Sequence, residues 1–292
     1  MIKIDRMTID DAGGNPHRLA LSVLNQIPDL KPPIPVREIA YSVDIHEIKE
    51  EKNIGIEGAL VTKDDKSGGL ILLNSERHET RKRFTIGHEL GHYLSPWHRS
   101  TSPNGFRCGS QDMTAETFES SDRAKRMEVE ANQFSAELLM PSRLINDYLK
   151  RHPGLDITHI VDISERYKVS RESAGRRYVS IHTEPAALVF SKDGIVRYVK
   201  KSQFFPSLRS WNRTPLPEKS ISKRLKMSPG NISGWEQVDS DEWLSGRSKR
   251  QLIEQTMSQS SGFQVTLLTF EEDDHYDDDK ENEPWSPPTF HR

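Results

Sequence analysis

Apolar and polar residues alternate with two different periods in the first quarter of the chain. Apolar positions at helical spacing predict a helix over residues 16–27, and a proline turn within 31–40 leads into a second short helix. Three short apolar runs follow at 44–50, 56–62 and 68–74, separated by turn residues, and these runs predict strands. Because a small sheet must bury its apolar face, the order predicts a sheet packed against helices.

A long helical pattern follows the third predicted strand. Asn74 and Ser75 are both candidates for its N-cap, because a short polar side chain can accept a hydrogen bond from a free backbone N–H. Glu76 and Glu79 then fall in the first turn, where negative charge is favourable. The apolar stripe of this helix continues to Leu94.

The middle of the chain passes from an irregular segment to a run of helices. Residues 95–123 are rich in Pro, Ser, Gly and Thr and are longer than a plain connector, which predicts a flap or an insertion. Helical patterns cover 123–140 and 142–152, and the first of them stops before a proline. Two further short helices in 155–180 flank the tripeptide 168–170 and resemble a helix-turn-helix.

A change of composition after Thr183 indicates a separate C-terminal α/β domain. Apolar residues alternate with polar ones on both sides of Asp193-Gly194, which predicts a β-hairpin, and a further strand is predicted at 262–270. The sequence therefore predicts an α+β protein whose four parts are 1–152, 153–182, 183–270 and 271–292.

Charge and composition argue against a membrane-spanning or disulfide-bonded protein. The net charge of the 292 residues is −3, and the segment 271–283 alone carries −8, which leaves +5 for the remainder. Such an acidic run is typical of a solvated, flexible tail. No apolar run approaches the roughly 18 residues that span a bilayer, and one cysteine cannot form an intrachain disulfide. These features predict a cytoplasmic protein without a membrane segment.

The strongest chemical signal is the sequence His88-Glu89-Leu90-Gly91-His92. On a helix, residues four apart lie on one face, so both imidazoles can bind one metal ion while Glu89 serves as a general base. Glycine costs about 1 kcal/mol in a helix relative to alanine, so Gly87 and Gly91 indicate a close approach to the backbone there.

A zinc site of this kind needs a third protein ligand, and three residues are candidates. His98 has the spacing of a third histidine, but Ser95 stands where that motif needs glycine, so His98 is otherwise expected at the surface. Glu128 borders the apolar stripe of the 123–140 helix, whereas Glu130 falls beside Glu137 on the expected solvent face. Glu128 is the preferred ligand, because zinc compensates a buried carboxylate.

The two helical motifs together resemble the ImmA/IrrE family of zinc-dependent endopeptidases. The resemblance rests on RKRFTIGHELGHYL at 81–94 and EVEANQFSAELLMP at 128–141, and weaker similarity covers roughly 15–150. Ser135 stands where the family commonly has alanine, and the insertion at 95–123 is longer than usual.

The resemblance implies a zincin-like, minimal gluzincin domain in 1–152, with Zn²⁺ held by His88, His92 and Glu128 and with Glu89 as the catalytic base. Asn132, one turn beyond Glu128, is expected to orient a ligating histidine.

The resemblance also extends, more weakly, to the rest of the chain. Longer family members carry a GAF-like sensor or regulatory domain, so the resemblance implies such a domain at 183–270. The family also implies cleavage of a helix-turn-helix transcriptional repressor, and this cleavage would induce a stress-response or mobile-element regulon. The alternative is a non-catalytic regulator that binds DNA or a partner protein and keeps a structural zinc.

Two further expectations concern macromolecular partners. The strand at 68–74 is expected to pair with an extended substrate, since main-chain hydrogen bonds bind peptides in this way. The helix-turn-helix-like segment could contact DNA through Arg171, Arg176 and Arg177, although a structural role in docking the C-terminal domain is preferred.

Overall fold

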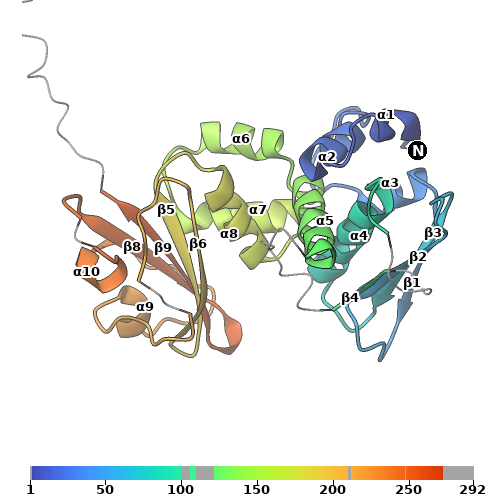
Figure 1. Ribbon diagram of the computed structural model, residues 1–292. Coiled ribbons are helices and arrows are strands. Elements are labelled where there is room, and N and C mark those ends of the chain that lie inside the picture. Colours follow the sequence, from blue (N-terminus) through green and yellow to red (C-terminus); the bar gives the residue numbers. More distant parts are fainter. Residues whose placement is uncertain (1, 100–105, 110–121, 210–211, 247, 272–292) are drawn as a thin grey trace, which may run out of the picture. The chain divides into compact units, whose positions relative to one another are not determined.

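The chain divides into two compact units, Met1–Thr183 and Glu184–Arg292. The computed structural model describes residues 2–99, 106–109, 122–209, 212–246 and 248–271 (Figure 1). The mixed α+β class predicted from the sequence is confirmed. The acidic tail predicted at 271–292 lies, apart from its first residue, outside the described residues, as does most of the flap predicted at 95–123.

A four-stranded sheet forms one layer of the first unit. Its strand order is β1-β3-β2-β4, in which β1 and β3 are parallel and the other neighbours are antiparallel. The strands span β1 Ile45–Glu51, β2 Gly58–Thr62, β3 Gly69–Asn74 and β4 Phe106–Cys108. The three predicted strands are therefore present, and β4 comes from the segment predicted to be a flap.

The position of β3 corrects one expectation. Both of its edges are occupied, by β1 on one side and β2 on the other. Its backbone groups are committed to the sheet, so the expectation that it pairs with an extended substrate was wrong. The pattern of one strand cannot reveal whether that strand is central or at an edge.

Helices cover this sheet and pack against one another. Helix α4 contacts β2, β3 and the long helix α5, and Figure 1 shows α4 and α5 side by side. Helix α2 packs on α5, and α3 packs on α4 and β1. The bounds are α1 Arg6–Asp10, α2 Pro16–Leu24, α3 Val36–Ser42, α4 Glu79–Leu94 and α5 Arg123–Leu139.

The start of α4 differs from the expectation. Its N-cap is His78, whose ring nitrogen accepts a hydrogen bond from the backbone N–H of Thr80. Asn74 instead ends β3, and its side-chain oxygen accepts from the N–H of Glu76 in a turn before the helix. Glu79 lies in the first turn as expected, whereas Glu76 lies outside the helix. The side chain of Asn74 thus stabilises the turn rather than the helix end.

Three shorter helices complete the first unit. Helix α6 spans Ser142–Arg151, and α7 Ile157–Tyr167 and α8 Arg171–Ile181 pack together across the predicted turn. Lys168 has a left-handed conformation in this turn, with φ of 51°. The two helices expected here are therefore present and pack against each other.

Arg177 of α8 is buried and tied to the end of α5. Its guanidinium forms a very short ion pair with Glu137 and donates to the carbonyl of Met140 at 3.0 Å and to Ser142 Oγ at 2.8 Å. Glu137 is 1% exposed, so its expected place on the solvent face was wrong. Arg177 is therefore occupied within the fold and does not offer its charge to DNA.

The second unit is built on a five-stranded antiparallel sheet in the order β6-β5-β9-β8-β7. The predicted hairpin is confirmed as β5 and β6, and Asp193 and Gly194 of its turn both have positive φ, 50° and 77°. The elements are β5 Ala186–Lys192, β6 Ile195–Lys201, α9 Ile221–Arg224, β7 Glu236–Val238, α10 Ser240–Trp243, β8 Leu252–Ser258 and β9 Phe263–Phe270. Strand β8, a partner of β9, was missed from the sequence.

A buried carboxyl group, Glu254, lies in β8. Its oxygens accept hydrogen bonds from Trp243 Nε1 at 2.7 Å and, very closely, from the backbone N–H of Ile221. Burial raises the pKa of Glu254 to about 7, against the effect of the two hydrogen bonds. Glu254 therefore binds a proton more tightly in the folded protein than in the unfolded chain.

We expect the C-terminal unit to lose stability as pH rises from 5 to 8. The unfolded Glu254 has its ordinary pKa of 4.5, so the stabilisation present at low pH begins to disappear above 4.5 and is lost above about 7. A shift of this size corresponds to at most about 3 kcal/mol. Amide hydrogen exchange of β8 and β9 in the full chain, corrected for intrinsic rates, measures it. Glu254→Gln should remove this pH slope, and an unchanged slope would contradict the assignment.

None of the helices in the described ranges combines the length and the hydropathy needed to cross a bilayer.

Candidate metal centre

Helix α4 brings three chemical groups to one buried position. His88, Glu89 and His92 are each 0% exposed. The i, i+4 spacing puts the two imidazoles on one side of the helix, where His88 Nε2 and His92 Nε2 are 3.1 Å apart. Glu89 is next to His88 in the chain and lies on the same buried helix. The sequence pattern alone therefore determines the spacing of these groups.

Helix α5 supplies a carboxylate to the same point. Glu128 Oε2 lies 3.1 Å from His88 Nε2, and Oε1 lies 3.4 Å from His92 Nε2. One ligand atom from each of the three residues lies within 4.8 Å of the others. The side chain of Glu128 is 18% exposed, so solvent reaches the cluster at Glu128.

The protonation states of the cluster suit a cation. Burial opposes ionisation of Glu128, but the hydrogen bonds to His88 and His92 outweigh it and hold the pKa of Glu128 well below its usual range. Burial lowers the pKa of His92 to about 4, so its imidazole is neutral at pH 7. Burial also opposes ionisation of His88, but Glu128 and Glu89 outweigh it and raise the pKa of His88. Metal binding requires both imidazoles to be neutral at the ligating nitrogen, so a metal ion would compete with protons for His88.

The two glycines of α4 allow α5 to approach. A Cβ atom on Gly91 would lie 2.9 Å from the Cα of Ala131, and one on Gly87 would lie 2.5 Å from Ser135 Oγ. Ser135 Oγ also donates to the carbonyl of Phe84 at 2.9 Å. The close backbone approach expected at these glycines is confirmed, and it brings Glu128 within reach of the histidines.

A third close approach, at Gly58, lies beside Glu89. A Cβ atom on Gly58 of β2 would lie 2.3 Å from Thr85 Cγ2 and 3.4 Å from Glu89 Oε1. The absence of a side chain at Gly58 therefore lets the sheet lie directly against the helix beside this carboxylate.

Each imidazole of the cluster has a polar partner on its other nitrogen. His88 Nδ1 lies 2.9 Å from Asn132 Oδ1, the residue singled out from the sequence for this task. His92 Nδ1 lies 3.1 Å from His98 Nδ1. Because the nitrogens that face Glu128 are both Nε2, these contacts lie on the far sides of the rings.

His98 and Glu130, the two alternative ligands, lie outside the cluster. His98 Nε2 is 3.3 Å from Glu130 Oε2, and Arg126 Nε donates to Glu130 Oε1 at 2.9 Å. His98 is 1% and Glu130 9% exposed, so their expected places at the surface were wrong. Helix α5 is covered by α4 and also by α2, and the helical wheel assumed a single covered face.

The C-terminal end of α4 is held by a lysine that sequence reasoning missed. Lys66 is 8% exposed, and its Nζ donates to the carbonyls of His92 at 2.7 Å and Ser95 at 2.6 Å. Burial lowers the pKa of Lys66 to about 7, and in its charged form Lys66 interacts favourably with the dipole at this end of the helix. The signal available in the sequence was only a turn rich in Lys and Asp.

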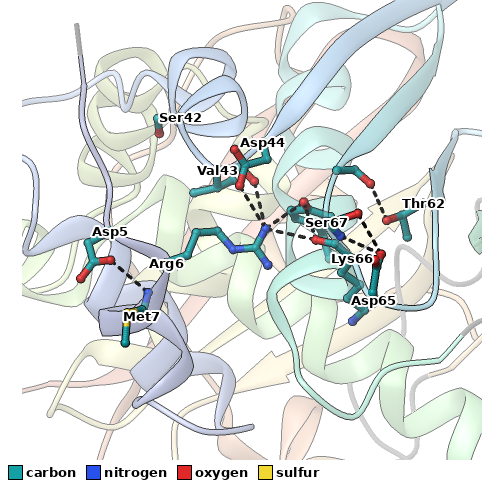
Figure 2. A network of polar contacts seen from close by, with 12 residues as sticks. Asp5, Arg6, Met7, Ser42, Val43, Asp44, Thr62, Asp65, Lys66 and Ser67 are labelled. Atoms are coloured by element: carbon teal, nitrogen blue, oxygen red, sulfur yellow. Dashed lines mark hydrogen bonds and ion pairs between the residues drawn. The ribbon is translucent and has the colours of Figure 1, made fainter.

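Arg6 of α1 holds the turn that contains Lys66. Figure 2 shows its guanidinium directed at the carbonyls of Val43 and Lys66 and at the carboxylate of Asp44, at distances of 3.3 to 3.5 Å. Arg6 also donates to the hydroxyl of Tyr93 on α4 at 2.8 Å. Through Arg6, the N-terminal helix is therefore connected to α4 and to the turn that contains Lys66.

One aromatic residue of the insertion also reaches the site. Phe106 of β4 stacks on the ring of His92, with ring centroids 4.5 Å apart. The composition of the insertion, rich in Pro, Ser, Gly and Thr, gave no sign of this strand.

The donor set fits a zinc-like cation. Two neutral imidazole nitrogens and one carboxylate are the ligands of the catalytic zinc sites that keep a position open for water. The three groups come from two helices, α4 and α5, which approach each other closely at Gly87 and Gly91.

Three comparisons describe what the chain is similar to. Residues 50–178 match the model of a peptidase family described as the IrrE N-terminal-like domain. The chain is 31% identical over 115 residues to "Uncharacterized immunity region protein 2" of Bacillus phage phi105, a match that covers 35% of this chain and 65% of the phage protein. A solved structure described as a Mycobacterium tuberculosis transcriptional regulator covers 91% of this chain and 74% of that chain, at 11% identity and a TM-score of 0.49.

Proposed function

We propose, from the match of residues 50–178 to the model of the IrrE N-terminal-like domain, that the protein is a zinc-dependent endopeptidase that cleaves a helix-turn-helix transcriptional repressor. The observation that carries the proposal is the grouping of His88, His92 and Glu128 beside the buried carboxylate of Glu89. Structural zinc sites use four protein ligands, whereas three leave a position for chemistry. Among the described residues the grouping offers three, which favours the enzyme over a regulator with a structural zinc.

Glu89 and Asn132 have separate roles in the proposed reaction. When bound, zinc supplies a Lewis acid that polarises the scissile carbonyl and acidifies water. Glu89 takes a proton from the attacking water and returns it to the leaving amine, as a general base and then a general acid. Asn132 accepts a hydrogen bond from His88 Nδ1–H and so keeps the lone pair of Nε2 directed at the ion.

The name of the phage relative supports the proposed substrate class, and the second unit is a candidate for regulation. The phage relative is named for an immunity region, which is consistent with control of a repressor, and a stress-response or mobile-element regulon is the process we propose. The five-stranded sheet of the second unit would serve as a GAF-like sensor or regulatory domain.

Metal analysis of two glutamate variants tests the proposed ligand set. We expect Glu128→Ala to lose bound zinc, because it removes one of three ligands, whereas Glu130→Ala keeps all three and should still bind about one equivalent when zinc is in excess. Atomic emission measures the zinc content after equilibrium dialysis against excess zinc, corrected for the zinc in the outer solution. Equal zinc in Glu128→Ala and the wild type would overturn the ligand set. Loss of zinc only in Glu130→Ala would move the third ligand to Glu130.

Cleavage in cells tests the activity itself. The full chain is co-expressed with the helix-turn-helix proteins encoded beside it, and the products are identified by intact-mass analysis. One discrete cut in one of these proteins, absent after treatment with a zinc chelator, is the expected result. A protein that binds zinc, leaves all of them intact and shifts DNA in gels would instead be the non-catalytic regulator.

A further inference from the structure

A chain of polar contacts leads from His92 away from the metal cluster to the surface of α5. His92 Nδ1 lies 3.1 Å from His98 Nδ1, and His98 Nε2 lies 3.3 Å from Glu130 Oε2. Glu130 Oε1 in turn accepts from Arg126 Nε at 2.9 Å. The His92 and His98 side chains are at most 1% exposed, so the contact between these two rings is shielded from water.

The chemistry of Arg126 and Glu130 determines which atom donates in each of these hydrogen bonds. The arginine can only donate, and a carboxylate paired with it can only accept. His98 must therefore carry its proton on Nε2 to donate to Glu130. A neutral His98 then has a lone pair on Nδ1, which accepts a hydrogen bond from Nδ1–H of His92. That leaves the lone pair of His92 on Nε2, the nitrogen that faces Glu128.

We propose that His98 is a positioning residue, which together with Glu130 fixes the tautomer and ring orientation of His92 so that Nε2 is always presented to the metal. The inference rests on the proposed function, since it concerns the same site. His98 does not touch the ion or the substrate; it acts through the imidazole of His92.

The surroundings of His98 hold it in place for this role. The ring of Trp97 lies edge-on to it, with centroids 4.6 Å apart, and Arg126 lies 4.8 Å from the Trp97 ring centroid. Lys66 binds the carbonyls of His92 and Ser95 on the turn that leads to His98. The segment after α4 is thus fixed from both sides, and it is not a loose extension of the helix.

His98 and Asn132 have equivalent tasks on the two histidines. Asn132 accepts from His88 and His98 from His92, so each ligand has one partner that selects the same nitrogen for the metal. Loss of such a partner costs about 10–100-fold in metal affinity in known metal sites. We expect a loss of this size for His98→Phe, which keeps the ring shape and removes both nitrogens.

The experiment measures the zinc affinity of the full chain by competition with a chromogenic chelator. The variants are His98→Phe, Glu130→Leu and the rescue variant His98→Gln, whose amide can accept from His92 and donate to Glu130. His46→Phe, at an exposed position on β1, is the matched control. Far-ultraviolet circular dichroism and the melting temperature without metal establish that each variant is folded. Long-range ¹H–¹⁵N correlation spectra of the metal-free proteins report the tautomer of His92.

The expected result has three parts. His98→Phe and Glu130→Leu bind zinc more weakly than the wild type, His98→Gln recovers part of the loss, and His92 passes from one tautomer to a mixture only in the two weakened variants. A folded His98→Phe that binds zinc within twofold of the wild type and keeps one His92 tautomer overturns the inference and leaves the proposed function intact. Wild-type protein that binds no zinc overturns both. Should His98→Phe fail to fold, Glu130→Leu decides alone by the same two readouts.

Discussion

Replacement of Glu89 by Gln is expected to reduce kcat/KM for repressor cleavage by about 10²–10⁴-fold, the range typical of a lost general acid–base group. Glu89 is fully buried next to His88, and its carboxylate lies against Gly58, where no side chain intervenes. The glutamine keeps the size of the side chain and cannot accept the proton. Cleavage of purified repressor under single-turnover conditions measures the change.

Two controls separate this loss from trivial causes. Zinc content should equal that of the wild type, because Glu89 is not among the three grouped ligands. Glu79→Gln makes the same substitution on the same helix, at a side chain that is 56% exposed, and should cleave at the normal rate. Normal cleavage by Glu89→Gln would remove Glu89 as the general base of the proposed mechanism.

Arg177→Ala is expected to destabilise the first unit by about 3–5 kcal/mol, the cost of leaving a buried charge without its partner. Glu137 is 1% exposed, and burial opposes its ionisation, but contacts with His17, Arg177 and Ser142 hold its pKa near 2. Without the arginine, the carboxylate must remain charged in the interior or take up a proton. Urea denaturation of the full chain, followed by amide hydrogen exchange in α5 and α8, measures the loss.

Two further variants help to distinguish a structural role of the helix-turn-helix-like segment from a role in DNA binding. Arg171→Ala removes a less buried arginine from the first position of α8 and should cost less than 1 kcal/mol. The double variant Arg177→Met/Glu137→Leu should recover most of the stability, because a well-packed apolar pair can replace a buried ion pair. A stable Arg177→Ala that has lost DNA binding would instead give this arginine the role in DNA recognition considered from the sequence.

Short-range patterns determined much of this protein. The i, i+4 spacing of His88 and His92 fixed their common face, and Gly87 and Gly91 indicated the close approach of α5. Asp193-Gly194 predicted its hairpin because both turn positions need positive φ. These features depend on neighbours within a few residues, so a single sequence contains them.

Tertiary structure alone decided the surroundings of the metal cluster. Glu130 and His98 were expected at the surface but are buried and contact each other. The helical wheel could not show this, because α5 is covered on more than one face. The central place of β3 and the contact of Phe106 with His92 depend on pairing between distant strands. Periodicity records which side of an element is apolar. It does not record which other element packs against that side. The contact of His92 with His98 depends on this packing and is visible only in the tertiary structure.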